Sequence, residues 1–114
     1  MDVLQKAIDG EIKLFYSQAI LNETQRILRD KFGYRPARLT EITDILKTYG
    51  VEVTPQERLA AVPSDPDDNA IVEAAVAGNC EAIVTGDKDL LRLRSFRGIR
   101  MMSAGEFLQQ ERQR

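Results

Sequence analysis

Histidine and tryptophan are absent from this chain of 114 residues, and Cys80 is its single cysteine. Without histidine, Ser-His-Asp and Cys-His catalysis, His-ligated zinc and imidazole acid–base chemistry are all excluded. A lone cysteine cannot form an internal disulfide and most often serves as a small buried apolar side chain.

Long hydrophobic runs are absent as well. None approaches the roughly 20 residues that a membrane helix needs, and residues 1–6 lack the charged-then-apolar pattern of a signal peptide. We therefore expect a cytoplasmic protein without a membrane partner. The length fits one small domain, and 43% hydrophobic with 30% charged residues is typical of a globular core.

The charges are unevenly distributed, although the net charge is only −2. Acidic residues cluster at Asp65, Asp67 and Asp68. Basic residues gather near the end of the chain, at Arg92, Arg94, Arg97, Arg100, Arg112 and Arg114. A solvated surface explains this pattern, and so does a protein that holds cations and phosphates together.

Alternating helical and short strand patterns predict an α/β architecture with a mainly parallel sheet. Helices are predicted at residues 2–8, 18–32, 36–49, 69–77, around 90–91 and after the capping box at 103–106. Strands are predicted at residues 12–16, 51–53, 82–85 and 99–102.

Asp87 follows the predicted strand at residues 82–85. In open α/β sheets, ligands bind beyond the carboxyl ends of the strands, which makes Asp87 a candidate ligand-binding residue. An ordinary turn aspartate is the alternative, because Gly-Asp is common in turns.

Three acids within four positions, Asp65, Asp67 and Asp68, precede the predicted helix at residues 69–77. Helix capping explains at least one of them, but three such charges repel one another unless a cation is near. Glu23 lies three residues after Ile20 and four before Ile27, on or beside an apolar helical stripe. It lies either at the edge of that stripe or in a cleft. Clustered carboxylates are suited to Mg²⁺ or Mn²⁺, which activate water at phosphodiesters without histidine.

Several motifs together resemble a known family. They are Asp-Pro-Asp-Asp-Asn-Ala from Asp65, Ala-Ile-Val-Thr-Gly-Asp-Lys-Asp-Leu-Leu from Ala82, and Ser-Ala-Gly-Glu-Phe from Ser103. With Glu23 and the Phe32-Gly33 pair, they are similar to PIN-domain proteins, in the branch described as toxins of toxin–antitoxin pairs.

The resemblance implies a three-layer α/β/α PIN-like domain and an endoribonuclease that depends on Mg²⁺ or Mn²⁺. Residue by residue, Glu23, Asp68 and Asp87 match the catalytic, metal-binding acids, and Asp89 matches an accessory metal ligand. Asp65 and Asp67 are expected to be loop and capping residues, and Thr85 matches a small polar residue near the metals. Lys88, Arg92 and Arg94 are the residues we expect to hold the RNA backbone.

The chain departs from the family pattern at its start. The family opens with a central apolar strand that carries the first metal ligand, whereas residues 2–8 read as the helix that follows it. We therefore expect residues 1–114 to form an N-terminally truncated domain that lacks the usual first central strand. Its two neighbours would then expose strand edges, which favours a homo-oligomer with exchanged or shared strands.

Two functions stay open at this stage. The first is a metal-dependent ribonuclease toxin with RNA as substrate and an antitoxin protein as partner, its activity in question without the first acidic ligand. The second is a non-catalytic PIN remnant that binds a protein partner or RNA. A nucleotide-binding α/β domain is weaker, because the chain lacks both glycine-rich phosphate-binding motifs.

Overall fold

The computed structural model describes residues 2–62 and 65–113. The helices are α1 Asp2–Ile8, α2 Gln18–Asp30, α3 Pro36–Tyr49, α4 Pro66–Ala77, α5 Lys88–Leu93 and α6 Ala104–Arg112. The strands are β1 Leu14–Tyr16, β2 Gly50–Glu52, β3 Ala82–Val84, β4 Ser95–Phe96 and β5 Ile99–Met102. Arg114 of the basic stretch and residues 63–64 before α4 lie outside the described residues.

The strands form two sheets. Strand β1 pairs in parallel with β2, with Phe15 opposite Val51. Strand β5 pairs in parallel with β3 and in antiparallel with β4. The predicted α/β class and the mainly parallel pairing are confirmed. Among the described residues, β1 and β3 each have a strand partner on one side only, and no strand joins the two sheets.

Local sequence signals set the ends of several helices. The side chain of Ser17 caps α2 by accepting from the Ile20 N–H at 3.3 Å. Ser103 and Glu106 form the predicted reciprocal capping box at the start of α6. Gly50 follows the last residue of α3, and only glycine fits there without a shift, because a Cβ would lie 2.5 Å from the Leu46 carbonyl oxygen and 3.0 Å from the Tyr16 ring.

Two predicted boundaries differ from the structure. Helix α4 starts at Pro66 and not at Asn69, because Asp65 caps it and proline suits the first helical position. The two-residue strand β4 was not predicted, since Ser95 and Phe96 carry no alternating pattern that sets them apart from the adjacent loop.

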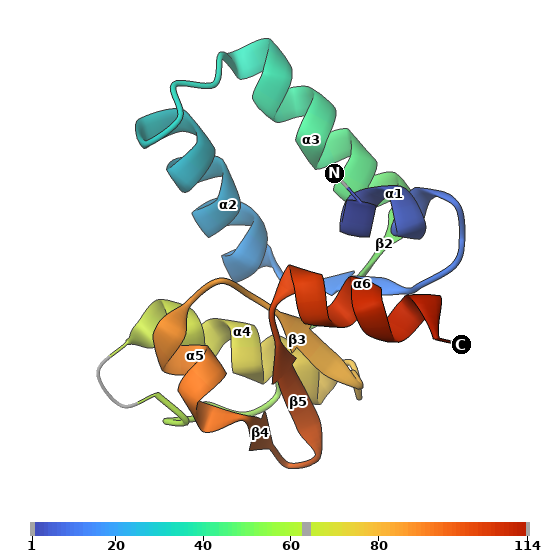
Figure 1. Cartoon of the computed structure of the whole chain (residues 1–114). Coiled ribbons are helices and arrows are strands. Elements are labelled where there is room, and N and C mark those ends of the chain that lie inside the picture. Colours follow the sequence, from blue (N-terminus) through green and yellow to red (C-terminus); the bar gives the residue numbers. More distant parts are fainter. Residues whose placement is uncertain (1, 63–64, 114) are drawn as a thin grey trace.

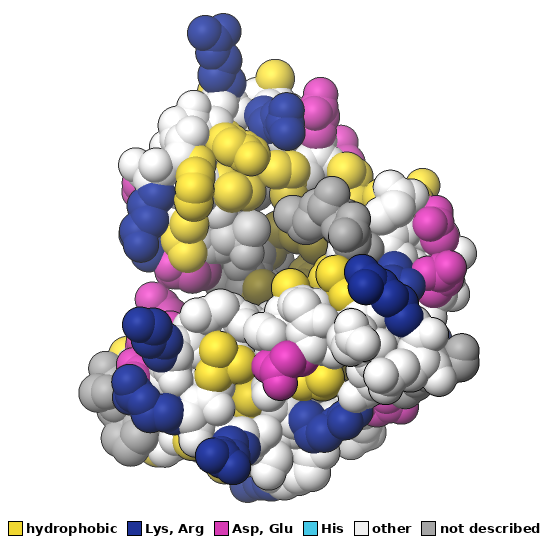
Figure 2. All heavy atoms as spheres, viewed as in Figure 1, with side chains coloured by type: hydrophobic (Ala, Val, Ile, Leu, Met, Phe, Trp, Pro, Cys, Tyr) yellow, Lys and Arg dark blue, Asp and Glu magenta, His cyan; other side chains and the backbone are white. Residues whose placement is uncertain are grey.

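The elements fall into two groups that lie one above the other (Figure 1). The upper group holds α1, α2, α3 and the β1–β2 pair. Helices α2 and α3 form a hairpin that projects away from the lower group, which holds α4, α5 and the sheet of β3, β4 and β5. Helix α6 lies between the groups and contacts α1 and β5. Figure 2 shows hydrophobic side chains across the α2–α3 half and a hollow between the two groups. Within the described residues, no helix combines the length and apolarity needed to cross a membrane.

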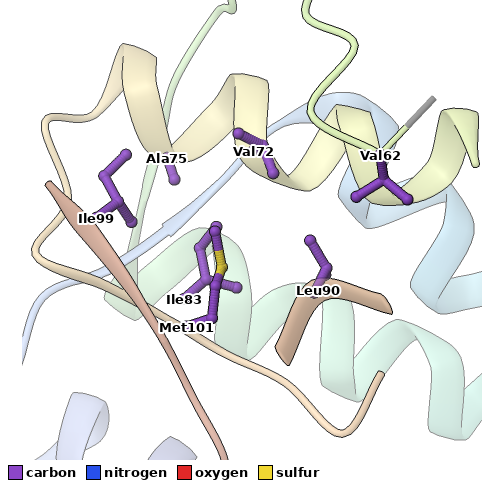
Figure 3. Close-up of a cluster of buried hydrophobic side chains, with 7 residues drawn as sticks. All are labelled: Val62, Val72, Ala75, Ile83, Leu90, Ile99 and Met101. Carbon is purple, nitrogen blue, oxygen red and sulfur yellow. The ribbon is translucent and has the colours of Figure 1, made fainter. Parts of the chain in front are cut away.

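The main core lies in the lower group, where α4 and α5 cover one face of the β3–β5 pair (Figure 3). Met101 faces this core, and the adjacent Met102, also buried, points to the opposite face of the sheet. The buried core residues are Val62, Val72, Ala75, Ile83, Leu90, Ile99 and Met101. Helix α3, by contrast, contains no buried residue.

Leu90 is the side chain on which this core is most easily tested, because its exposed fraction is 0%. We expect Leu90→Ala to lower the free energy of unfolding by about 2 to 5 kcal/mol through lost burial and a residual cavity. Val51→Ala is the control, since Val51 is 43% exposed and should cost less than about 1 kcal/mol. Urea unfolding followed by circular dichroism measures both, and equal losses would contradict this placement of the core.

Candidate metal centre

Asp65 and Asp68 lie on the same side of the first turn of α4. The Asp65 side chain is the N-cap and accepts from the N–H groups of Asp67 at 3.1 Å and Asp68 at 3.2 Å. Residues three apart on a helix are neighbours on its surface, so the cap brings the two carboxylates together. Pro66 at the first helical position fixes the backbone between them.

Asp87 approaches from the lower sheet, where β3 leads into α5. Its backbone N–H donates to Thr85 Oγ1 at 3.0 Å. Its side chain caps α5 by accepting from the N–H groups of Asp89 at 2.8 Å and Leu90 at 3.2 Å. Both caps hold their carboxylates in place through backbone contacts, which makes the position of Asp87 as well defined as that of Asp65.

Asp65, Asp68 and Asp87 form one acidic group. Each offers a carboxylate oxygen, and these oxygens all lie within 4.8 Å of one another. We call these three residues the acidic centre. Two of them were predicted as metal ligands, and the third, Asp65, was predicted only as a capping residue. The spacing of three between Asp65 and Asp68, together with the capping position, was the signal that could have added Asp65.

Asp68 is the buried member of the acidic centre, with 5% of its surface exposed. Its Oδ2 atom has no hydrogen-bond partner among the described residues. Burial, followed by the charges of Asp87 and Asp65, raises the pKa of Asp68 to about 7. A buried carboxylate with an unpaired oxygen and two acidic neighbours requires either a proton or a cation.

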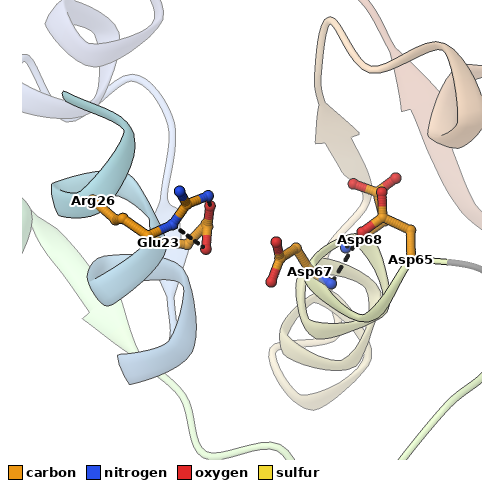
Figure 4. Close-up of polar contacts among 5 residues, drawn as sticks. All are labelled: Glu23, Arg26, Asp65, Asp67 and Asp68. Atoms are coloured by element: carbon orange, nitrogen blue, oxygen red, sulfur yellow. Dashed lines mark hydrogen bonds and ion pairs between the residues drawn. The ribbon is translucent and has the colours of Figure 1, made fainter. Parts of the chain in front are cut away.

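Glu23 lies outside the acidic centre in the described part of the chain. Its two carboxylate oxygens accept from Arg26, one from Nη2 and the other from Nε at 3.3 Å. Figure 4 shows this pair on α2 facing α4, with Asp67 pointing towards it and Asp65 and Asp68 further away. The charge of Asp67 also contributes to the raised pKa of Arg26, after the larger effect of Glu23.

The remaining predicted site residues lie on and just after α5. Asp89 accepts from Arg92 Nη1 at 2.7 Å and is not part of the acidic centre. Lys88, Arg92 and Arg94 are exposed, and Arg94 ends α5 with a positive φ of 62°. Of the predicted RNA-binding residues, Lys88 directly follows Asp87, Arg92 and Arg94 lie five and seven residues beyond it, and all three are open to solvent.

The acidic centre fits a hard divalent cation. Three carboxylates without nitrogen or sulfur ligands suit Mg²⁺, Mn²⁺ or Ca²⁺ better than zinc. The unpaired Oδ2 of Asp68 supplies the independent indication, because capping does not explain a buried oxygen that accepts nothing. The arrangement can therefore bind a divalent metal at the carboxyl end of β3.

The fold and this acidic centre define an α/β protein with a candidate divalent-metal site. A family model for the PIN domain matches residues 2–89. The chain therefore belongs to the PIN-domain family, as its motifs predicted, and this is a nuclease family that generally uses a divalent metal and acts on nucleic acid. No curated protein matches the chain.

The raised pKa of Asp68 makes the metal-free protein sensitive to pH. The folded state binds more protons than the unfolded state between the ordinary value of 3.8 and about 7, so this carboxyl lowers stability as pH rises through that window. We expect Asp68→Asn to raise the unfolding free energy by about 2 to 4 kcal/mol at pH 8 and to have little effect at pH 3.5.

Asp67→Asn is the matched control, because Asp67 is an exposed acid on the same helical turn. It should show no stabilisation that grows with pH. Urea unfolding from pH 3.5 to 8 in the presence of EDTA measures the effect. If Asp68→Asn were destabilising at pH 8, Asp68 would not be the unpaired buried acid described above.

Proposed function

We propose that this protein is an endoribonuclease that depends on Mg²⁺ or Mn²⁺, with the cation held by Asp65, Asp68 and Asp87. The observation that carries the proposal is the buried, unpaired Oδ2 of Asp68 beside two further carboxylates. A cation there removes the repulsion among the three acids and satisfies that oxygen. The cation, when bound, supplies activation of water and neutralises charge on the scissile phosphate.

The chain itself supplies the positioning of these groups. Two helix caps fix Asp65 and Asp87, so neither carboxylate must be ordered when the cation arrives. Lys88, Arg92 and Arg94 are exposed cations near Asp87, and we assign them the task of holding the RNA backbone. They offset the repulsion that the acidic centre exerts on a polyanion.

Glu23 is the proposed further ligand, as the family resemblance implies. The Arg26–Glu23 pair is partly open to solvent, with 50% and 27% of the two side chains exposed. Such pairs contribute roughly 0 to 1 kcal/mol, so Glu23 can leave Arg26 at small cost. We propose that Arg26 neutralises Glu23 until a cation occupies the acidic centre.

The narrower parts of the proposal rest on the resemblance of the motifs. They are RNA as the nucleic acid, a toxin role with an antitoxin partner, and one domain over residues 1–114. The open edges of β1 and β3 support a homo-oligomer with shared or exchanged strands, because unpaired edges favour pairing with another chain.

Cation binding and RNA cleavage provide the first test of this proposal. We expect Asp87→Asn to weaken Mn²⁺ binding about tenfold or more and to abolish cleavage, because asparagine keeps the helix cap but removes the charge. Isothermal titration with Mn²⁺ and cleavage of a labelled single-stranded RNA measure the two effects.

Asp67→Asn is again the control, since Asp67 points away from the acidic centre (Figure 4). Cation binding by the natural protein without RNA cleavage would favour the non-catalytic alternative. No Mn²⁺ binding, or equal binding by the Asp87→Asn variant, would refute the site.

The role of Arg26 gives a separate prediction. We expect Arg26→Gln to tighten Mn²⁺ binding by about threefold or more, since the Glu23 carboxylate loses its cationic partner. Arg29→Gln is the matched control, because Arg29 pairs with Asp30 at 2.9 Å on the same helix and carries the same charge. Isothermal titration distinguishes them, and an equal gain in both variants would show a general charge effect and not a role for Glu23.

A further inference from the structure

The turn between α2 and α3 is a second concentration of positive charge, separate from the basic residues near α5. Residues 26–41 contain five cationic and two acidic side chains, whereas the whole chain has a net charge of −2. The cations are Arg26, Arg29, Lys31, Arg35 and Arg38. Arg26 and Arg29 are paired with acids on α2, whereas Lys31, Arg35 and Arg38 lie outside the ion pairs formed within the described part of the chain.

Aromatic side chains lie among Lys31, Arg35 and Arg38. Phe32 is 66% exposed, the highest fraction among the large hydrophobic side chains of the described residues. The Arg38 guanidinium lies over the Tyr34 ring, 5.3 Å from its centroid. An exposed phenyl ring and a guanidinium stacked on a tyrosine both present flat surfaces on which nucleobases stack.

A shallow depression, open to solvent, lies at this turn. It is lined by Tyr34, Arg35, Ala37, Arg38 and Glu41. The first turn of α3 contains no acid, and Arg35 makes no side-chain cap there, so the start of the helix adds to the positive potential. With two arginines and a tyrosine against the single acid Glu41, this depression is complementary to a flexible polyanion that carries bases.

The location of the turn relates it to the acidic centre. Lys31 lies eight residues beyond Glu23 along α2, which corresponds to about 12 Å of helix. Glu23 itself faces α4 and its acids (Figure 4). In Figure 2, Lys and Arg side chains lie over α2 and over the lower group, with Asp and Glu side chains between them at the left edge. A strand held at the turn could therefore extend along α2 to the acids.

We propose that Lys31, Phe32, Tyr34, Arg35 and Arg38, the α2–α3 turn surface, bind single-stranded RNA outside the cleavage site. Bases stack on Phe32 and on the Arg38–Tyr34 pair, and Lys31, Arg35 and Arg38 contact phosphates. The surface deepens the proposed function by naming the form of nucleic acid that it takes and the direction from which the strand approaches. The role of this surface in cleavage rests on the proposed ribonuclease activity. RNA binding itself does not, because it can be measured without cleavage.

The test is fluorescence anisotropy of a labelled single-stranded RNA of about 12 nucleotides in EDTA, at several salt concentrations. We expect the double variant Arg35→Gln/Arg38→Gln to lower affinity about tenfold at low salt. The slope of log affinity against log salt should fall by about 1.4, because each phosphate contact with a single strand contributes about 0.7. Phe32→Leu keeps an apolar side chain but loses the stacking face, and we expect about a tenfold loss without a change in slope.

Lys47→Gln/Arg112→Gln is the matched control, because it removes the same charge from the far end of α3 and from α6. An equal loss of affinity in both double variants would overturn the proposal, since net charge alone would then explain it. So would unchanged binding in the turn variants, no RNA binding by the natural protein, or equal affinity for duplex RNA together with no effect of Phe32→Leu. Thermal unfolding verifies that each variant is folded.

The outcome is separable from that of the proposed ribonuclease. If the turn variants bound RNA more weakly but the natural protein showed no Mn²⁺-dependent cleavage, the RNA-binding surface would stand and the ribonuclease proposal would be rejected. If neither RNA cleavage nor RNA binding changed in the turn variants, the ribonuclease proposal would stand and the RNA-binding surface would be rejected.

Discussion

Burying the carboxyl group of Asp68 at the start of α4 costs free energy, and no cationic side chain pairs with it among the described residues. Its Oδ2 atom accepts no hydrogen bond, and Asp65 and Asp87 add like charge to the cost of desolvation. A protein retains such an arrangement when another requirement outweighs stability, and a divalent cation is the simplest one. The surrounding elements position this centre. The Asp65 cap starts α4 and the Asp87 cap starts α5, and β3 leads to Asp87, which lies beside Asp65 and Asp68.

The two capping acids serve fold and candidate chemistry with the same side chains. Asp65 and Asp87 each give one oxygen to backbone N–H groups, and each also offers an oxygen to the acidic centre. Positive potential at the two helix starts lowers the cost of placing three acids together. In the proposed function, basic side chains near α5 and at the α2–α3 turn offset the repulsion between a polyanion and this acidic site on a chain whose net charge is negative.

Local signals in the sequence predicted most elements, because they act within a few residues. Ser17 and Ser103 specify helix starts through their own side chains, and the Asp-rich motifs specified both the family and two members of the acidic centre. Contacts between distant segments were harder to predict. The spacing of Asp65 and Asp68 indicated that these two acids are neighbours, but the sequence could not show that Asp87 lies beside them. Nor could it show that Arg26 pairs with Glu23, or that Ser95 and Phe96 pair beside β5. Those results depend on how α2, α4 and the sheet are placed relative to one another.

The uneven distribution of the core has a dynamic consequence. Val72 and Leu90 anchor the lower group with no exposed surface, whereas α3 buries no residue. Cooperative units of a protein open with free energies that follow their buried contacts, so we expect amide hydrogens of α3 to exchange with solvent before those of α4 and β5. On this expectation the acidic centre belongs to the slowly exchanging unit. The α2–α3 turn then belongs to a segment of lower local stability, which suits a surface that adjusts to a flexible ligand.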